Sequence, residues 1–107
     1  MSAFAVAHIR EVAMNADVAR YLTLIDETLA PFHGRFAVHG GAVEVLEGEW
    51  PGHLVVIQFP DRAAARAWYR SPAYQAIVRL RLNNSTGSCI LVDGVSPEHR
   101  ATDILDG

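Results

Sequence analysis

The sequence of 107 residues contains no lysine, so all nine of its Lys/Arg cations are arginines. Without lysine the protein cannot form a Schiff base with a carbonyl substrate, which excludes that class of covalent catalysis. It has a single cysteine, Cys89, which cannot form a disulfide within the chain. Because Cys89 lies in an apolar run, we expect a buried packing residue rather than a nucleophile, which would need a nearby cation or a helix N-terminus.

Long apolar stretches are also absent. No run approaches the roughly 20 residues that span a bilayer, and the N-terminus shows no basic region followed by a long apolar segment. We therefore expect a cytoplasmic protein with no membrane partner. The net charge of −3 argues against nucleic acid as a partner. The one basic row, formed by Arg62, Arg66 and Arg70 at helical spacing, predicts a solvated helix face.

The sequence does contain an alternation of strand and helix patterns. Short apolar runs bounded by Gly and Pro predict strands, and apolar residues at offsets of three and four after a capping side chain predict helices. The predicted strands cover residues 3–12, 35–39 with a continuation at 42–47, 53–59 and 88–93. The predicted helices cover residues 15–30 with Asn15 as cap, 62–70 with Asp61 as cap, and 72–82 after Ser71.

This order of strand, helix, two strands, helix and strand is typical of the ferredoxin-like α+β fold. We predict a four-stranded antiparallel sheet with the helices on one face and the first and third strands at its centre. In the first helix, the predicted core stripe consists of Val18, Leu22, Ile25 and Leu29. Residues 1–95 are expected to form this single domain, followed by a tail at 96–107 without periodicity.

One face of such a sheet has no helix to cover it. Small alternate residues of the first strand suit packing against helices, whereas Phe4, Val6, His8 and Arg10 point to the opposite face. Phe4 and Val6 indicate an interface, while His8 and Arg10 are too polar for a dry core. We therefore predict a homodimer joined through its sheets, with a cavity for a small-molecule ligand at that interface. The alternative is that His8 and Arg10 lie at a solvated strand end.

Two blocks of the sequence resemble a known family. They are GRFAVHGGAVEVLEGEW at 34–50 and VVIQFPDRAAARAWYRSPAYQAI at 55–77. The chain is similar to the domain-of-unknown-function 1330 family over about residues 3–95. The resemblance implies a ferredoxin-like subunit of a dimeric α/β barrel and no settled activity. Related barrels include cofactor-independent monooxygenases, muconolactone-type isomerases and haem-dependent enzymes, which is an analogy at the level of the fold.

Three positions depart from the pattern of that family. Met14 stands where an aspartate is common, His39 replaces an arginine before the Gly-Gly pair, and His33-Gly34 replaces an earlier Gly-Gly. All three lie near the ends of the predicted sheet, where the mouth of a cavity is expected. The ligand preference of relatives therefore does not carry over to this chain.

His39 is the strongest candidate for catalysis. Histidine titrates near neutral pH, and this one precedes the Gly40-Gly41 bend, so we consider it as a general acid–base group. Arg35 and Arg10 are the candidate catalytic cations, because a guanidinium stabilises a carboxylate or an enolate oxygen. The alternatives are a solvated strand-end histidine and arginines paired with nearby glutamates.

Five further side chains are candidates for ligand binding. They are His8, Trp50, Tyr69, Tyr74 and Arg81. Trp50 follows a glycine-rich turn and is expected either to anchor a dimer or to cover a cavity. No histidine spacing matches a helical metal site, so we predict no metal and no organic cofactor. Three functions stay open at this point: a small-molecule enzyme without a cofactor that carries out proton-transfer or oxygenase-type chemistry, a metabolite-binding protein, and a structural dimer.

Overall fold

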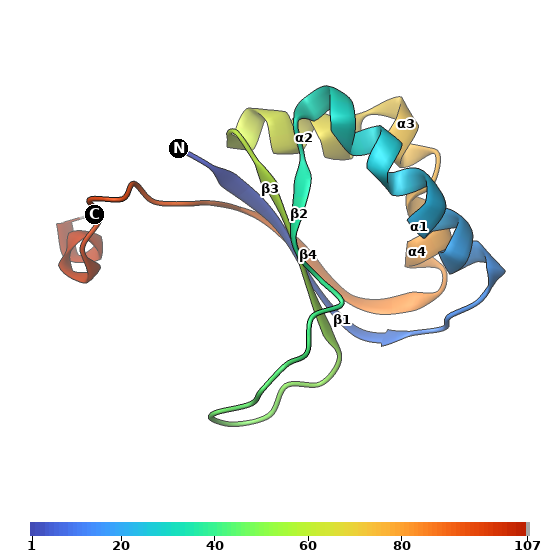
Figure 1. Cartoon of the computed structure of the whole chain (residues 1–107), viewed down its shortest axis with the longest axis horizontal. Coiled ribbons are helices and arrows are strands. Elements are labelled where there is room, and N and C mark those ends of the chain that lie inside the picture. Colours follow the sequence, from blue (N-terminus) through green and yellow to red (C-terminus); the bar gives the residue numbers. More distant parts are fainter. Residues whose placement is uncertain (107) are drawn as a thin grey trace.

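The computed structural model, which describes residues 1–106, shows one antiparallel sheet with helices against one of its faces (Figure 1). The strand order is β2-β3-β1-β4, so the predicted ferredoxin-like arrangement with the first and third strands at the centre is confirmed. The strands are β1 (Ala3–Val12), β2 (Arg35–His39), β3 (His53–Phe59) and β4 (Ser85–Asp93). The helices are α1 (Ala16–Leu29), α2 (Arg62–Arg70), α3 (Pro72–Gln75) and α4 (Val78–Leu82), with 3₁₀ turns η1 (Ala30–Phe32) and η2 (Ala101–Asp106).

The first three helices begin at capping side chains. The Oδ1 atom of Asn15 accepts a hydrogen bond from the amide of Val18 at 3.0 Å, and Asp61 accepts one from Ala64 at 2.7 Å. Ser71 caps α3 through its hydroxyl, and Pro72 occupies the first turn of that helix. Each cap satisfies an amide that has no partner inside its helix, so the chain direction at all three starts follows from the local sequence.

The hydrophobic core lies between the sheet and the helices. Ala3 and Ala5 of β1 are buried, and their small side chains let the helices approach the sheet closely. Trp68, Tyr74 and Phe59 are the largest fully buried side chains. The indole Nε1 of Trp68 donates a hydrogen bond to the hydroxyl of Thr28 at 2.9 Å, so its polar atom is satisfied inside the core.

Several element boundaries differ from the prediction. Residues 42–47 form no strand, because β3 pairs with β2 only as far as His39 and the chain then leaves the sheet (Figure 1). The helix predicted at 72–82 is divided into α3 and α4, since Ile77 departs from helical geometry with φ of −113°. Strand β4 begins before the predicted start at Ser88. The tail contains η2, which its sequence pattern did not indicate.

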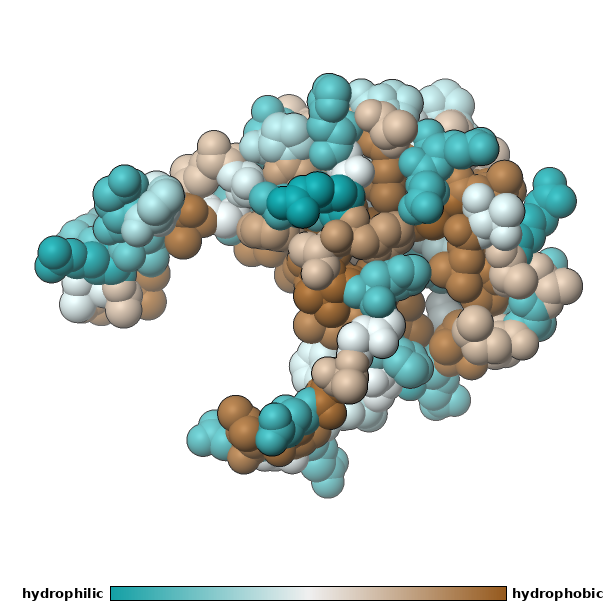
Figure 2. Space-filling view, in the orientation of Figure 1, coloured by the Kyte–Doolittle hydropathy of each residue, from teal (hydrophilic) through white to brown (hydrophobic). Residues whose placement is uncertain are grey.

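Two segments project from the sheet on the side away from the helices, namely residues 40–52 and 94–106 (Figure 1). Figure 2 shows a hollow between them with apolar residues at its base. The strand register places alternate residues of three strands on this uncovered side, which we call the open face. Its apolar members are Phe4 and Val6 of β1, Leu54 and Val56 of β3, and Ile90 and Val92 of β4.

Cys89 is exposed, so the prediction of a buried thiol was wrong. The reason is that β4 is an edge strand, and an edge strand has less of the chain around it than the central strands. In the described part of the chain, no helix is long and apolar enough to cross a membrane.

Candidate functional site

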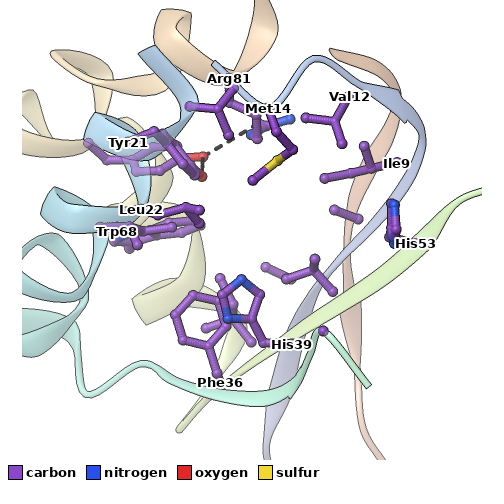
Figure 3. A pocket seen from close by; sticks show the side chains of 18 residues that line it. Ile9, Val12, Met14, Tyr21, Leu22, Phe36, His39, His53, Trp68 and Arg81 are labelled. Carbon is purple, nitrogen blue, oxygen red and sulfur yellow. Dashed lines mark hydrogen bonds between the residues drawn. The ribbon is translucent and has the colours of Figure 1, made fainter. Parts of the chain in front are cut away.

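A pocket of about 220 Å³ lies between the sheet and the helices (Figure 3). It is on the helix-covered side, opposite to the open face where the sequence analysis placed a cavity. Alanines at positions 5 and 7 of β1 help to leave this space, because neither side chain reaches far toward the helices. Most of the lining is apolar: Ala5, Ala7, Ile9, Val55 and Ile57 from the sheet, and Val18, Leu22, Ile25 and Trp68 from the helices.

Three polar side chains from three helices meet at one end of the pocket. The hydroxyls of Tyr21 in α1 and Tyr74 in α3 are 2.8 Å apart and share a hydrogen bond. Arg81 in α4 donates from Nη2 to the Tyr74 hydroxyl at 3.4 Å, and its guanidinium carbon lies 5.9 Å from the centre of the Tyr21 ring. Figure 3 shows Tyr21 and Arg81 above the buried Trp68. We refer to Tyr21, Tyr74 and Arg81 as the polar cluster.

The polar cluster carries one positive charge. Burial raises the pKa of both Tyr21 and Tyr74 above the ordinary value of 10.0, so both phenols stay protonated at neutral pH. Arg81 is a permanent cation. Within residues 1–106 the ion pairs join other residues, Arg62 with Asp93 and His99 with Asp103. The guanidinium of Arg81 therefore faces the pocket with neutral hydroxyls beside it and no carboxylate to balance its charge.

His39 reaches the pocket because β2 contains a bulge. Phe36 pairs with Ile57 and His39 pairs with Val55, both of which face the helices, and the register shifts between Phe36 and Val38. The extra residue at position 37 brings Phe36 and His39 to the same side of the strand, where their rings stack at 4.3 Å. The sequence analysis placed the irregularity at Gly40-Gly41 instead.

The rim and the floor of the pocket differ in exposure. His39, His53 and Met14 are exposed and form the rim, whereas Tyr21, Tyr74 and Trp68 are buried and form the floor. Figure 3 shows His39 and His53 on the side of the cavity away from Arg81. Among the described residues, none forms a hydrogen bond with the imidazole of His39. The imidazole of His39 and the half-buried guanidinium of Arg81 thus lie at opposite ends of the pocket, with apolar side chains between them.

Three of the residues predicted for the site lie on the open face instead, and a fourth, Arg10, does not line the pocket. Arg35 donates from Nη2 to the side-chain oxygen of Gln58 at 2.9 Å, which holds β2 to β3. The ring nitrogen Nε2 of His8 lies 2.6 Å from the carbonyl oxygen of Pro51, and the His8 ring stacks on Trp50 at 4.4 Å. Arg10 is exposed and lies at a bulge of β1, where the pairing with β4 shifts register between Ile9 and Glu11. The structure therefore separates these four side chains from the pocket.

Tyr69 also lies outside the pocket. It packs edge-on against Trp68 with the ring centres 6.1 Å apart, and it lines a shallow surface depression together with Arg66 and Gln75. Of the eight predicted site residues, the pocket brings together His39, Tyr74 and Arg81.

The sequence analysis missed two polar residues of the pocket, Tyr21 and His53. Tyr21 is buried in the core stripe of α1, whereas Leu22, which we predicted for that stripe, is 38% exposed. The helical spacing of apolar residues could have identified Tyr21, because it lies three residues after Val18 and four before Ile25. His53 shares the parity of Val55 and Ile57 in β3, which places it on the helix side as the alternation of that strand indicates.

Comparisons with known proteins agree on the fold. No curated protein sequence matches the chain. A protein of unknown function from Rhodopseudomonas palustris is 18% identical with a TM-score of 0.63, and the match covers 90% of this chain and 82% of that one. A dimeric ferredoxin-like protein of unknown function from Jannaschia sp. CCS1 is 13% identical with a TM-score of 0.61, covering 90% of this chain and all of that one (100%).

A third solved structure has a stated activity. SnoaB, a cofactor-independent oxygenase from Streptomyces nogalater, is 13% identical with a TM-score of 0.56, and the match covers 92% of this chain and 96% of that one. Such low identities show a shared fold and nothing more specific. The sequence model of a protein family is more decisive, because it matches residues 2–95. The chain belongs to that family, the domain of unknown function DUF1330.

Proposed function

We propose that the protein is an enzyme that transfers a proton on a small organic substrate without a cofactor, and that the pocket between sheet and helices is its active site. The observation that carries this proposal is the arrangement of polar groups in the pocket. A cation with two neutral hydroxyls lies at one end, an imidazole lies at the other, and apolar walls separate them.

The proposed reaction uses these groups in two roles. A ring nitrogen of His39 takes a proton from a carbon or hydroxyl of the substrate, and the electron pair left behind moves onto a substrate oxygen. That oxygen faces Arg81 and a hydroxyl of the polar cluster, which stabilise the negative charge of the enolate or phenolate. Return of the proton to another atom of the substrate completes an isomerisation without any oxidant. The apolar walls strengthen this stabilisation because little water screens it.

The hydrogen bond between Tyr21 and Tyr74 uses one phenol proton and leaves the other available to a substrate. If Tyr74 donates to Tyr21, the proton of the Tyr21 hydroxyl is free to point into the pocket. Tyr74 already accepts from Arg81, which fits its role as donor to Tyr21. One phenol and the remaining guanidinium N–H groups are thus available to a substrate oxygen.

The experiment that tests this proposal measures hydrogen–deuterium exchange. One-ring enones such as cyclohex-2-enone, whose acidic C4–H lies across the ring from its oxygen, are incubated with the protein in deuterated water, and loss of that C–H signal is followed by NMR. We expect the wild type to accelerate exchange and His39→Asn to lose that acceleration while ligand affinity survives. Equal exchange rates with wild type and His39→Asn would remove the catalytic role of this residue. His8→Asn is the matched control, because His8 lies on the open face.

A binding protein without catalysis is the second candidate. The observation that favours it is that no described residue orients the imidazole of His39 by a hydrogen bond, as the base of many enzymes is oriented. In that case the same pocket holds a metabolite and no proton moves. The exchange experiment separates the two candidates, because a binding protein would bind the probe and leave its exchange rate unchanged.

We further propose that the protein is a homodimer joined through the open face. The centre of this face carries apolar side chains such as Val6, Val56 and Ile90, and the segments 40–52 and 94–106 enclose a hollow above it (Figure 2). The dimeric ferredoxin-like neighbour supports this assembly. Native mass spectrometry tests it, since a monomer at micromolar concentration would contradict the proposal. With one cysteine and no need for a disulfide, the reducing cytoplasm is the compartment we propose.

A further inference from the structure

We propose that the pocket selects a one-ring organic monoanion, with its carboxylate or enolate oxygens at Arg81 and its ring in the apolar part of the pocket. This inference rests on the proposed function in one respect, namely that the pocket binds a small molecule. It adds the size, the charge and the shape of that molecule, each of which comes from a separate feature of the site.

The volume of the pocket sets the size of the ligand. Pockets for drug-sized ligands measure roughly 300–1,000 Å³, and the pocket here is smaller at about 220 Å³. An engineered apolar cavity of roughly 150 Å³ in another protein holds benzene. The present pocket therefore has room for one ring with a short polar substituent, and a long alkyl chain or a fused ring system would not fit inside it.

The charges that line the pocket set the charge of the ligand. Arg81 is the cation, and the lining of the described pocket contains no aspartate or glutamate. The adjacent Tyr21 and Tyr74 are neutral donors. Arg81 is half-buried, and one partly desolvated positive charge is best balanced by one negative charge, because an unpaired ion is costly to remove from water. A second negative charge on the ligand would have no partner at the floor, and a cationic ligand would be repelled.

The shape of the ligand follows from the surfaces around the empty space. The indole of Trp68 and the ring of Tyr74, whose centres lie 4.1 Å apart, form part of the floor, and the ring of Phe36 closes another side. Figure 3 shows Trp68 and Leu22 on one side of the space and Ile9 on the other. A flat ring placed between them contacts aromatic surface on one side and aliphatic surface on the other, which suits aromatic packing.

The position of the charge relative to the ring is also fixed. Arg81 and the hydroxyls are at one end of the pocket, so the anionic group must be at one end of the ligand rather than at its middle. The opposite end of the ligand then lies toward His39 at the rim. Benzoate and phenylacetate have this form, with a terminal anion and an unsubstituted ring.

Calorimetric titration with four probes tests the charge and the ring separately. Benzoate has both features, benzamide keeps the shape without the charge, acetate keeps the charge without the ring, and decanoate replaces the ring by a long chain. We expect benzoate to bind at least tenfold more tightly than each of the other three. The same titrations on Arg81→Gln should abolish the preference for benzoate over benzamide, and Arg81→Lys should retain part of it.

Arg35→Gln is the matched control, because Arg35 is held by Gln58 on the open face and should keep the full preference. Circular dichroism shows whether each variant is folded. Equal affinity for benzoate and benzamide in the wild type, or an unchanged preference in folded Arg81→Gln, would overturn the inference of a monoanion while the pocket itself still binds. Tightest binding of decanoate would overturn the one-ring size. If none of the probes binds at millimolar concentration, the inference fails, while exchange of the enone can still support the proposed function.

Discussion

The two faces of the sheet use the same kinds of residue for different purposes. On the open face, Arg35 is bonded to Gln58, and His8 is held by Pro51 and stacked on Trp50. On the covered face, Arg81 has a 3.4 Å contact to a tyrosine and no carboxylate partner in the described chain, while the His39 imidazole has no hydrogen bond there. On the open face, the polar side chains have hydrogen-bond partners within the protein and stabilise the fold. On the covered face, His39 and Arg81 keep hydrogen-bonding capacity that a ligand in the apolar pocket can use.

The largest expected effect is a difference in stability between substitutions of the two tryptophans, Trp68 on the covered side of the sheet and Trp50 on the open side. Trp68 is 2% exposed and Trp50 is 39% exposed. Trp68→Ala should lower the free energy of unfolding by about 3–5 kcal/mol, because it removes a large core side chain and leaves Thr28 without its hydrogen-bond donor. Trp50→Ala should cost about 1 kcal/mol per subunit. Urea unfolding of both variants measures the difference, and equal losses would contradict the division into a packed and an open side.

The next prediction concerns assembly. Val6→Arg places a charge at the centre of the open face, between Val56 and Ile90 on the neighbouring strands. We expect a monomer in native mass spectrometry, since an unpaired charge would be buried between two sheets. Ala63→Arg adds the same charge to an exposed position of α2 and should leave the assembly unchanged. A dimer that persists in Val6→Arg would rule out pairing through this face.

The polar cluster predicts a dependence of stability on alkaline pH. The pKa values of Tyr21 and Tyr74 are raised in the folded protein, so the unfolded chain loses these protons first as the pH rises. The free energy of unfolding is therefore maintained below pH 10.0, the ordinary pKa, and falls above it. Urea unfolding from pH 8 to pH 11 should show this decline. Tyr74→Phe should show a shallower decline, because one of the two shifted phenols is gone; an equal slope would exclude the cluster as its cause.

The smallest expected effect belongs to the tail. A chain that ends at Ser96 loses residues 97–107, and the part of this segment that the structure describes, 97–106, is exposed throughout in the single subunit. Its melting temperature should stay within a few degrees of the full chain, because little buried surface is lost. A much larger decrease would indicate that the tail packs against a partner subunit. The open side of the sheet would then contribute to stability as well as to assembly.

The fold could be predicted from the sequence because its signals are local. Caps at Asn15 and Asp61, a proline after Ser71 and the alternation in β1 each depend on a few neighbouring residues. Segment 42–47 was predicted wrongly because a strand requires a partner, and its pattern carries no information on whether one is available.

The site was harder to predict because it depends on contacts between distant residues. The bulge in β2 changes the face on which His39 lies, and alternation alone cannot locate it. Tyr21, Tyr74 and Arg81 come from three helices and meet only after the chain has folded. Neither of the arginines chosen as catalytic lines the pocket, because Arg35 is bonded to Gln58 on the open face and Arg10 lies at a bulge of β1.

The pocket is lined by residues from all four helices and from β1, β2 and β3. It therefore interrupts the hydrophobic core itself, and an occupant would complete the packing between elements that are far apart in the sequence. Amide protons in those seven elements should then exchange with solvent more slowly when the pocket is filled, and those of β4 should change least. The pattern of protection along the chain would report occupancy even for a ligand whose chemistry is not yet known.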